Sequence, residues 1–268
     1  MRIALGIEYD GSAYSGWQRQ AHARSVQGAL QDAVGAVADH PVELTAAGRT
    51  DAGVHALMQV AHFDSDAQRP PHAWALGATA AGADDLTVLW ARPVPDRFNA
   101  RYSAVSRTYL YRVLNRPLRP ALERHRVCWV RRPLDAGAMH RAAQLLLGER
   151  DFSSFRAAEC QSSTPMRRLL EAEVSRHGEM VEFKVRANAF VHHMVRNLVG
   201  SLLQVGTGVR PETWMAELLE ARDRTQAGPT APPQGLYLAA VEYPAEFDLP
   251  SQAQAWGRLG SHSGGGPP

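Results

Sequence analysis

The stretch AAGRTDAGVHA, residues 46–56, places one carboxylate, Asp51, close to a fixed positive charge, Arg49. Gly48 and Gly53 flank this pair and let the backbone bend sharply and approach a ligand closely. Aspartate ordinarily has a pKa of about 3.9, and a neighbouring arginine favours its charged form. An ionised carboxylate suits a nucleophile or the stabilisation of positive charge, whereas a general acid needs a raised pKa. The alternative is a structural turn aspartate, which is common beside glycine.

A second stretch, ANAFVHHMVRNLVG at residues 187–200, puts His192, His193 and Arg196 into an otherwise apolar segment. A zinc site needs at least three protein ligands, and neighbouring histidines on a helix point about 100° apart. The other histidines of the chain show no matching spacing, so no metal site is predicted. Arg196 is more informative, because a buried arginine needs a carboxylate partner. Asp51 is a candidate for that partner.

Two tyrosines and a leucine are further candidates for the site. In RTYLYRVLN, residues 107–115, Tyr109 and Tyr111 lie two positions apart and therefore on one face of a strand. Either they are core aromatics, or one of them supports a flipped base by stacking. Near the last predicted strand, Pro232 and Pro233 make a rigid approach to Gly235, which Leu236 follows. Leu236 then either points into a cleft at the head of that strand or belongs to the core.

Basic residues are concentrated in one part of the chain, although the formal net charge is only +2. Residues 97–132 contain one acid, Glu123, several interleaved aromatic residues and ten arginines, which are residues 97, 101, 107, 112, 116, 119, 124, 126, 131 and 132. Arginine binds phosphate with two hydrogen bonds and stacks on bases, so this pattern suits an RNA-binding surface. The alternative is a solvated face held by salt bridges.

The composition is that of an ordinary globular protein, with 45% hydrophobic and 21% charged residues. No run of about 18 apolar residues is present, so no transmembrane helix is expected. An acid, Glu8, follows too early for a signal peptide. Cys128 and Cys160 stand apart, without the spacing of a zinc site or a disulfide framework. We therefore expect a cytoplasmic protein.

The apolar periodicity predicts two similar sets of elements around these residues. The first reads strand, helix, two strands, helix, strand, over residues 3–9, 25–40, 42–47, 54–63, 74–81 and 87–92. The second repeats this order with one additional helix, over residues 107–115, 135–147, 169–176, 180–186, 191–205, 211–222 and 237–243. We predict an α+β fold of two ferredoxin-like β-α-β-β-α-β halves, with a mixed, mainly antiparallel sheet and a cleft between the halves.

The expected boundaries follow from these elements. Residues 1–104 form the half with the Asp51 loop, and residues 105–248 form the half with Tyr109 and Arg196. Residues 249–268 lack periodicity and are expected to be a disordered tail.

Together these stretches closely resemble the tRNA pseudouridine synthase A family, from about Arg2 to Asp248. GRTDAGVHA is the most specific motif, and IEYDGSAYSGWQRQ, RFNARYSAVSRTYLY and GERDFSSFR accompany it. The resemblance implies an isomerase that converts uridine to pseudouridine at positions 38, 39 and 40 in the anticodon arm of tRNA. It further implies that the enzyme needs no cofactor and acts as a homodimer.

The resemblance carries the family's nucleophilic aspartate to Asp51 and its substrate-contacting tyrosine to Tyr109. The arginine implicated in displacing the target base falls on Arg49, and the helix arginine that pairs with the aspartate falls on Arg196. One departure concerns local structure or RNA contacts rather than the catalytic loop. Residues 77–85 read GATAAGADD, where family members usually carry an Asn and a Leu-Pro pair.

The chemistry agrees with this resemblance. Pseudouridine formation breaks the N1–C1′ bond, turns the uracil and forms a C5–C1′ bond, without a redox step. One carboxylate can act as nucleophile or stabilise a cationic sugar, and either Tyr109 or Asp51 could remove the C5 proton. The base must leave the stack, which calls for an aromatic platform and a basic rim.

Two other functions stay open at this point. A non-catalytic RNA-binding protein on the same scaffold would keep the arginines, but it need not keep the four polar site residues together. A metal-dependent hydrolase that uses His192 and His193 would lose its activity to a chelator.

Overall fold

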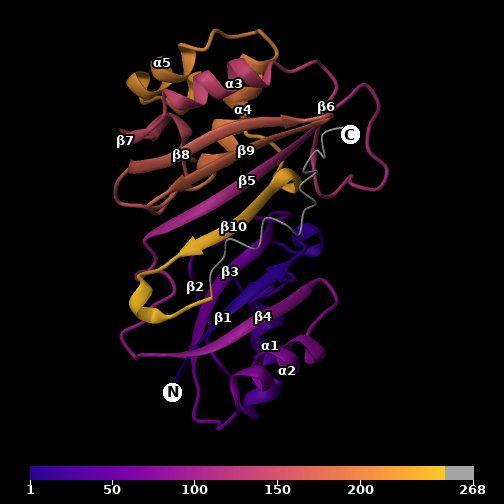
Figure 1. Ribbon diagram of the computed structural model, residues 1–268, viewed down its shortest axis with the longest axis vertical. Helices are drawn as coiled ribbons and strands as arrows, with labels where there is room; N and C mark the ends of the chain where they lie inside the picture. The colour runs from indigo at the N-terminus through magenta and orange to yellow at the C-terminus, as the bar shows by residue number, and fades with distance from the viewer. Residues whose placement is uncertain (251–268) are drawn as a thin grey trace, which may run out of the picture.

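A computed structural model describes residues 1–250 of the chain, and in these residues ten strands form one sheet (Figure 1). The strands are β1 (Arg2–Tyr9), β2 (Thr45–Ala46), β3 (His55–Asp64), β4 (Leu86–Val94), β5 (Ser106–Asn115), β6 (Cys128–Val130), β7 (Gly148–Asp151), β8 (Met166–His177), β9 (Met180–Ala187) and β10 (Leu236–Glu242). Their order is β4-β1-β3-β10-β5-β9-β8-β7, with β2 beside β3 and β6 beside β5.

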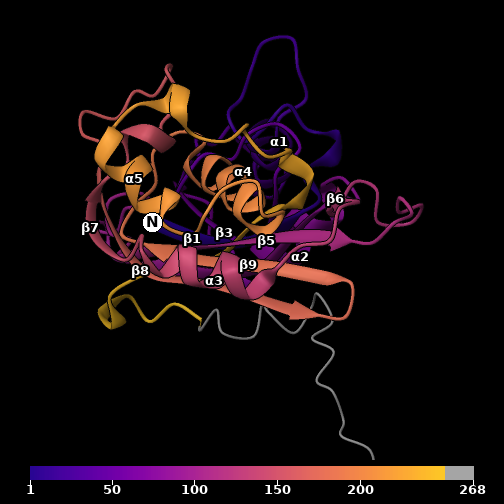
Figure 2. The ribbon, with the colours of Figure 1, turned by 90° about the horizontal axis from the view of Figure 1, so that it is seen from above.

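Five α-helices accompany the sheet in this part of the chain. They are α1 (Val26–Ala38), α2 (Pro71–Ala81), α3 (Ala136–Gln144), α4 (Met194–Gly206) and α5 (Trp214–Ala221). Figure 2 shows α1 and α4 on the same side of the sheet. Two helices begin at caps that the sequence suggests, because Ser25 accepts a hydrogen bond from the Gly28 amide and Asp135 accepts one from the Ala138 amide.

The strand order repeats within the chain. The first set runs β4-β1-β3-β2 across the sheet, and the second runs β10-β5-β9-β8. In each set the strand that comes last in the sequence, β4 or β10, lies beside the strand that comes first, β1 or β5. The neighbours pair antiparallel, except that β10 runs parallel to β3 and β6 runs parallel to β5. These findings confirm the predicted α+β fold with a mixed, mainly antiparallel sheet. The expected cleft between the halves stays a prediction.

The last strand, β10, joins the two sets of strands into one sheet. On one side Tyr237 and Leu238 pair in parallel with His55 and Ala56 of β3, and on the other side β10 runs antiparallel to β5. Leu236 belongs to the hydrophobic core around α3, α4 and α5, whereas Leu238 belongs to the core around α1 and α2. The side chains of β10 therefore serve both cores.

Several boundaries differ from the prediction. The helix expected from residue 191 begins at Met194, and Pro211 precedes α5, which begins at Trp214. The strand expected over residues 42–47 is reduced to β2, and the short strands β6 and β7 were not predicted. The expected tail falls almost wholly on residues 251–268, which lie outside the described residues. No helix in residues 1–250 is both long enough and apolar enough to span a membrane.

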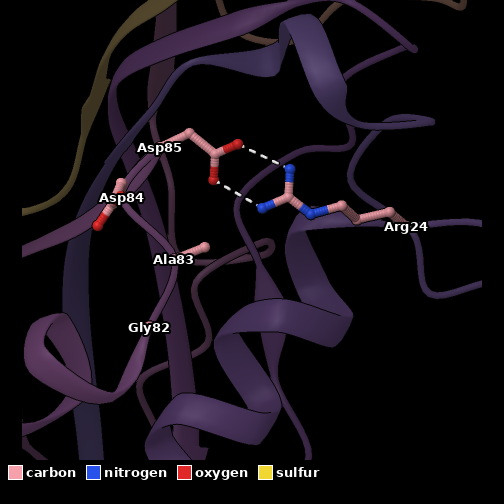
Figure 3. Close-up of a pocket in the computed structure, with 5 residues that line it drawn as sticks. All are labelled: Arg24, Gly82, Ala83, Asp84 and Asp85. Atoms are coloured by element: carbon pink, nitrogen blue, oxygen red, sulfur yellow. Dashed lines mark hydrogen bonds and ion pairs between the residues drawn. The ribbon is translucent and has the colours of Figure 1, made fainter.

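Residues 77–85, the segment that departs from the family pattern, are held at their end by an ion pair and a hydrogen bond to Asp85. Arg24 donates two hydrogen bonds to the Asp85 carboxylate, at 2.7 and 2.9 Å (Figure 3). The Tyr14 hydroxyl donates a third. Arg24 and residues 82–85 line a cavity of about 490 Å³. Since the contacts of Asp85 come from the segment after β1, they connect the departing segment to the surroundings of the Asp51 loop.

Candidate active site

The loop that carries Asp51 lies between β2 and β3 and is fixed by the segment that follows β1. The Trp17 amide donates to the Thr50 carbonyl at 2.9 Å, and the Tyr9 hydroxyl lies 2.7 Å from the Thr50 hydroxyl. Gly16 is needed at this contact, because a Cβ atom there would lie 2.8 Å from the Thr50 carbonyl oxygen. The motif IEYDGSAYSGWQRQ therefore positions the backbone on both sides of Asp51.

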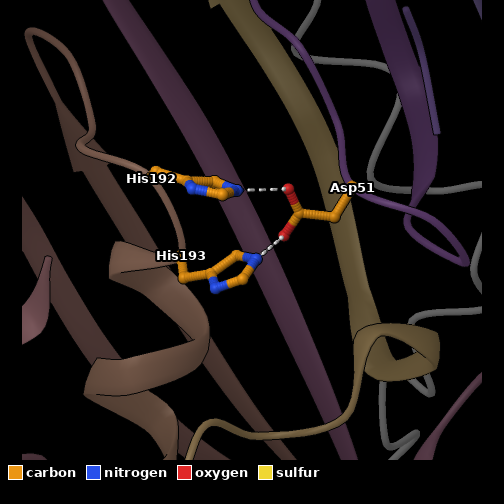
Figure 4. A group of neighbouring side chains, drawn as sticks. All are labelled: Asp51, His192 and His193. Atoms are coloured by element: carbon orange, nitrogen blue, oxygen red, sulfur yellow. Dashed lines mark ion pairs between the residues drawn. The ribbon is translucent and has the colours of Figure 1, made fainter. Parts of the chain in front are cut away.

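Three side chains from the other half of the sequence contact the Asp51 carboxylate (Figure 4 draws the two histidines). The Arg196 Nη1 atom donates to Oδ2 at 2.9 Å, which confirms the predicted pairing of Arg196 with Asp51. The His193 Nε2 atom lies 3.2 Å from Oδ2, and the His192 Nε2 atom lies 3.5 Å from Oδ1. The Asp51 side chain keeps 27% of its surface exposed, so a substrate can still reach it.

Arg196 is the most buried member of this group, with 15% of its side chain exposed. It lies in the first turns of α4, whose Met194, Val195 and Leu198 are buried in the core. Its Nε atom donates to the Ala231 carbonyl at 2.8 Å, which leaves Nη1 for Asp51. One guanidinium thus joins α4, the segment that leads to β10, and the Asp51 loop.

The two histidines precede α4, and His193 has a left-handed backbone with φ of 61° and ψ of 5°. This conformation is rare for residues other than glycine and costs about 1–2 kcal/mol, so its presence beside Asp51 suggests a functional constraint. Burial lowers the pKa of His193, although the charge of Asp51 opposes that effect. A neutral His193 can donate one hydrogen bond to the carboxylate. The centroids of the His192 and His193 rings lie 3.9 Å apart.

Asp51, His192 and His193 also form the group, among residues 1–250, that could hold a metal ion. Their ligand atoms lie within 4.8 Å of one another. The Arg196 guanidinium, however, donates to the same carboxylate and adds a positive charge that opposes a bound cation. The expectation of no metal at this site stays a prediction.

Tyr109 extends from β5 towards the same region and packs against both hydrophobic cores. Its ring meets the Phe190 ring edge to face, with 5.0 Å between the centroids. Burial, followed by the negative charge of Asp51, raises the pKa of Tyr109 to about 12. The phenol therefore stays protonated at neutral pH, which makes Tyr109 a poor base and leaves it as a platform or hydrogen-bond donor.

The two remaining predicted site residues occupy different environments. Arg49 is exposed, and its expected contact with RNA stays a prediction. Leu236 is 5% exposed and lies opposite Tyr111 in the sheet, inside the hydrophobic core. The structure thus brings Asp51, Arg196 and Tyr109 into one region, whereas Leu236 contributes to the packing behind it.

Sequence reasoning did not find the contacts of His192 and His193 with Asp51. It placed both histidines on a helix, where their side chains would diverge, but neither residue is in α4. The missed signal is the pair of polar rings directly before an apolar helix that carries a buried arginine. This position lets all three side chains face one carboxylate.

The arginines of residues 97–132 divide into paired and exposed residues. Four of them form ion pairs with acids from distant parts of the chain, namely Arg97 with Glu246, Arg112 with Glu182, Arg116 with Glu179, and Arg126 with Asp10. Arg107 donates to four main-chain carbonyls. The remaining five, Arg101, Arg119, Arg124, Arg131 and Arg132, are exposed. The salt-bridged alternative is therefore correct for part of this set, and the exposed arginines stay candidates for RNA.

Comparisons with known proteins give a consistent result. The model of the tRNA pseudouridine synthase family matches residues 6–103 and 142–244. A protein named tRNA pseudouridine synthase A from Xanthomonas euvesicatoria is 57% identical over 254 residues, which cover 94% of this chain and 99% of the relative. The protein of the same name from Escherichia fergusonii is 56% identical over 249 residues, with 93% and 92% covered. These relatives match almost the whole chain.

Proposed function

This chain belongs to the tRNA pseudouridine synthase family, and we propose that it isomerises uridine at positions 38, 39 and 40 of the tRNA anticodon arm. The observation that carries the proposal is the convergence of Arg196, His192 and His193 on the single carboxylate of Asp51. A scaffold that only bound RNA would have no need to collect these four polar groups from two distant segments. The coincidence therefore favours an enzyme.

In the proposed reaction the target uridine leaves the stack and enters the region of Asp51 and Tyr109. The N1–C1′ bond breaks and its electron pair stays on the uracil, while one Asp51 oxygen attacks C1′ or stabilises the cationic sugar. We assign Oδ1 to this step, because Oδ2 is held by Arg196 at 2.9 Å and His193 at 3.2 Å, and the contact of Oδ1 with His192 is longer, at 3.5 Å.

The second half of the reaction restores the enzyme. The uracil turns, C5 forms a bond to C1′, the C5 proton is removed and N1 takes up a proton, so that all atoms balance without a redox partner. The raised pKa of Tyr109 argues against its acting as the base. We therefore propose that the released Asp51 carboxylate removes the C5 proton, that Tyr109 supports the flipped base, and that Arg49 fills the space which the base leaves in the RNA.

A direct test is tritium release from tRNA that carries C5-labelled uridine, with the modified positions mapped. The wild-type chain should release tritium from positions 38, 39 and 40. Asp51→Asn keeps the size of the side chain but removes the charge, so it should abolish release while tRNA affinity stays within a few-fold. Turnover by a clean Asp51→Asn preparation would remove Asp51 from its role. Tight binding without release by the wild type would favour the RNA-binding alternative.

Two further parts of the proposal rest on the resemblance and on the substrate. We propose a homodimer, which light scattering on the purified chain would test, and a cytoplasmic location, because the tRNA substrate is processed there. The proposed chemistry requires no cofactor. Activity that survives a chelator would exclude the metal-dependent hydrolase.

A further inference from the structure

A buried histidine outside the proposed chemistry, His55, lies four residues after Asp51 at the first position of β3. Only 3% of its side chain is exposed. A buried polar ring needs partners for both nitrogens, because an unsatisfied one costs about 1–3 kcal/mol. The partners of His55 come from three segments that are far apart in the sequence.

The contacts define which nitrogen of His55 carries the proton. Its Nδ1 atom accepts a hydrogen bond from the Gly11 amide at 3.1 Å. In the neutral ring the proton then lies on Nε2, which donates to the carbonyls of His125 at 2.9 Å and Gln234 at 3.2 Å. The ring also stacks on Tyr237, with 4.7 Å between the centroids.

Burial lowers the pKa of His55, and Arg126 acts in the same direction, whereas Asp10 opposes it. The Asp10 Oδ1 atom lies 3.2 Å from Nδ1, and Arg126 forms an ion pair with the other Asp10 oxygen at 3.1 Å. The net effect favours the neutral ring, as the contact with the Gly11 amide requires.

These contacts hold the base of one loop, residues 116–127 between β5 and β6, which we call the arginine loop. His125 receives the hydrogen bond from His55, Arg126 pairs with Asp10, and the Tyr237 hydroxyl donates to the Arg126 carbonyl at 2.6 Å. Beyond this base the loop projects away from the sheet (Figures 1 and 2). Besides Arg126, which is exposed but paired with Asp10, it carries two further exposed arginines, Arg119 and Arg124.

We propose that His55 is a positioning residue, which fixes the arginine loop relative to Asp51 so that its exposed arginines meet tRNA phosphates while the target uridine reaches the carboxylate. Since only three residues separate His55 from Asp51, a displacement of the loop changes the distance between the phosphate contacts and the reacting carboxylate. This inference rests on the proposed function for its RNA part. The placement of the loop itself can be measured without RNA.

Two substitutions separate the two nitrogens of His55. His55→Gln places an amide N–H near the position of Nε2 and keeps the donor to the arginine loop. His55→Asn places a carbonyl oxygen near the position of Nδ1 and keeps the acceptor for Gly11, but loses the contact with the loop. We expect His55→Asn to raise the KM for tRNA roughly threefold to tenfold, the loss expected for one hydrogen bond, with a smaller change in kcat. His55→Gln should restore most of the affinity.

Limited proteolysis with trypsin measures directly how accessible the arginine loop is. Proline follows Arg116 and Arg119 and blocks cleavage after them, so the accessible site in the projecting part is the bond after Arg124. His55→Asn should be cleaved there faster than the wild type, and His55→Gln at nearly the wild-type rate. The matched control is His62→Asn, since His62 lies on the same strand and its Nδ1 atom accepts from the Ala100 amide instead. The control should leave the cleavage rate after Arg124 unchanged.

Tyr237→Phe provides a second route if His55→Asn does not fold, because it removes a separate hydrogen bond to Arg126. It should also speed cleavage after Arg124 and raise the KM. If folded His55→Asn and Tyr237→Phe both show the wild-type cleavage rate and KM, His55 does not position the loop. Faster cleavage in a chain whose wild type releases no tritium would instead contradict the proposed function and leave the placement of the loop intact.

Discussion

At the scale of single residues, the site depends on how few groups hold the Asp51 carboxylate. The donors come from one short stretch, residues 192–196, and the strongest of them is the Arg196 guanidinium at 2.9 Å. Because the same guanidinium also donates to the Ala231 carbonyl, its loss affects stability and chemistry together.

We predict that Arg196→Ala lowers the free energy of unfolding by about 3 kcal/mol, towards the low end for a broken buried pair because Asp51 is partly exposed. Urea denaturation measures this loss, and tritium release should fall in the same variant. Arg150→Ala is the control, since Arg150 is an exposed arginine on β7. An Arg196→Ala protein as stable as the control would mean that the ion pair contributes nothing to the fold.

The pairing of Asp51 with Arg196 could be predicted from the sequence, because a charge in an apolar helix requires an opposite charge. For the histidine contacts the sequence offers only the pair of polar rings before the helix, since their direction depends on the left-handed backbone of His193, which no periodicity reveals. The sequence also left open whether Leu236 points into a cleft or lies in the core. A loop residue and the first residue of a strand look alike until the partner strand is known.

At the scale of the elements, α4 packs in close contact with residues 229–231, which precede β10. A Cβ atom on Gly200 would lie 1.7 Å from the Pro229 carbonyl oxygen, and the Ala231 amide donates to the Arg196 carbonyl at 3.0 Å. Asn197, which is fully buried, donates to the Phe155 carbonyl and accepts from Arg224 and Thr230. These contacts place the segment that holds Arg196 in position.

We predict that Gly200→Ala destabilises the protein by about 3 kcal/mol or more, because the clash is with backbone that cannot rotate away. Activity should fall further than the loss of folded protein explains, since a shift of residues 229–231 moves the acceptor of Arg196. Thermal unfolding and tritium release per folded molecule measure both effects. Gly35→Ala in α1 is the control, where the gain in helix propensity offsets a milder contact with the His40 carbonyl.

The long elements could be predicted because each carries its own apolar pattern, and α1 and α3 also begin at side-chain caps. The short strands β2, β6 and β7 carry too few residues for a pattern, and they exist only through their partners β3, β5 and β8. The sequence also predicts the start of α4 three residues too early, at residue 191 instead of Met194. Val191 is buried and continues the apolar pattern of the helix, whereas His192 and His193 leave that pattern and contact Asp51.

At the scale of the whole molecule, the distribution of charge makes a measurable prediction about RNA. Arg119→Ala combined with Arg124→Ala should flatten the slope of log K against log salt by about one to two units, as two lost phosphate contacts would. Filter binding at several salt concentrations measures the slope. Arg116→Ala is the matched control in the same loop, because Arg116 already pairs with Glu179 and should change the slope less. Equal slopes for the double variant and the wild type would show that neither arginine meets phosphate.

The buried histidines predict how stability depends on pH. Burial lowers the pKa values of His55 and His62 below the ordinary value of about 6.5, so the folded chain binds fewer protons than the unfolded chain just below that pH. The free energy of unfolding should therefore fall as pH decreases from about 7 to about 5, by up to about 1.4 kcal/mol per pH unit for each histidine. Urea denaturation should show that the free energy of unfolding falls less over this pH range in His62→Gln than in the wild type. A variant of the exposed His72 should show the same fall as the wild type.

The union of the two strand sets was predicted only in outline. Element order predicted two similar halves with a mixed sheet, but it did not indicate that β10 would lie between β3 and β5 and run parallel to β3. That arrangement depends on contacts between residues about 180 positions apart, such as Tyr237 and His55, which local patterns do not contain.

The position of β10 also bears on how the protein is made. During synthesis the first half leaves the ribosome with the inner edge of β3 uncovered, and β5 likewise waits for its neighbour, until residues 236–242 emerge. An uncovered strand edge invites pairing with other chains, so the nascent protein passes through an aggregation-prone interval. Because β10 joins the two strand sets, the halves that carry Asp51 and Arg196 are connected in the sheet only once β10 has paired. We therefore expect ribosome-bound chains that end before β10 to be inactive, and slow translation near the end of the message to increase misassembly.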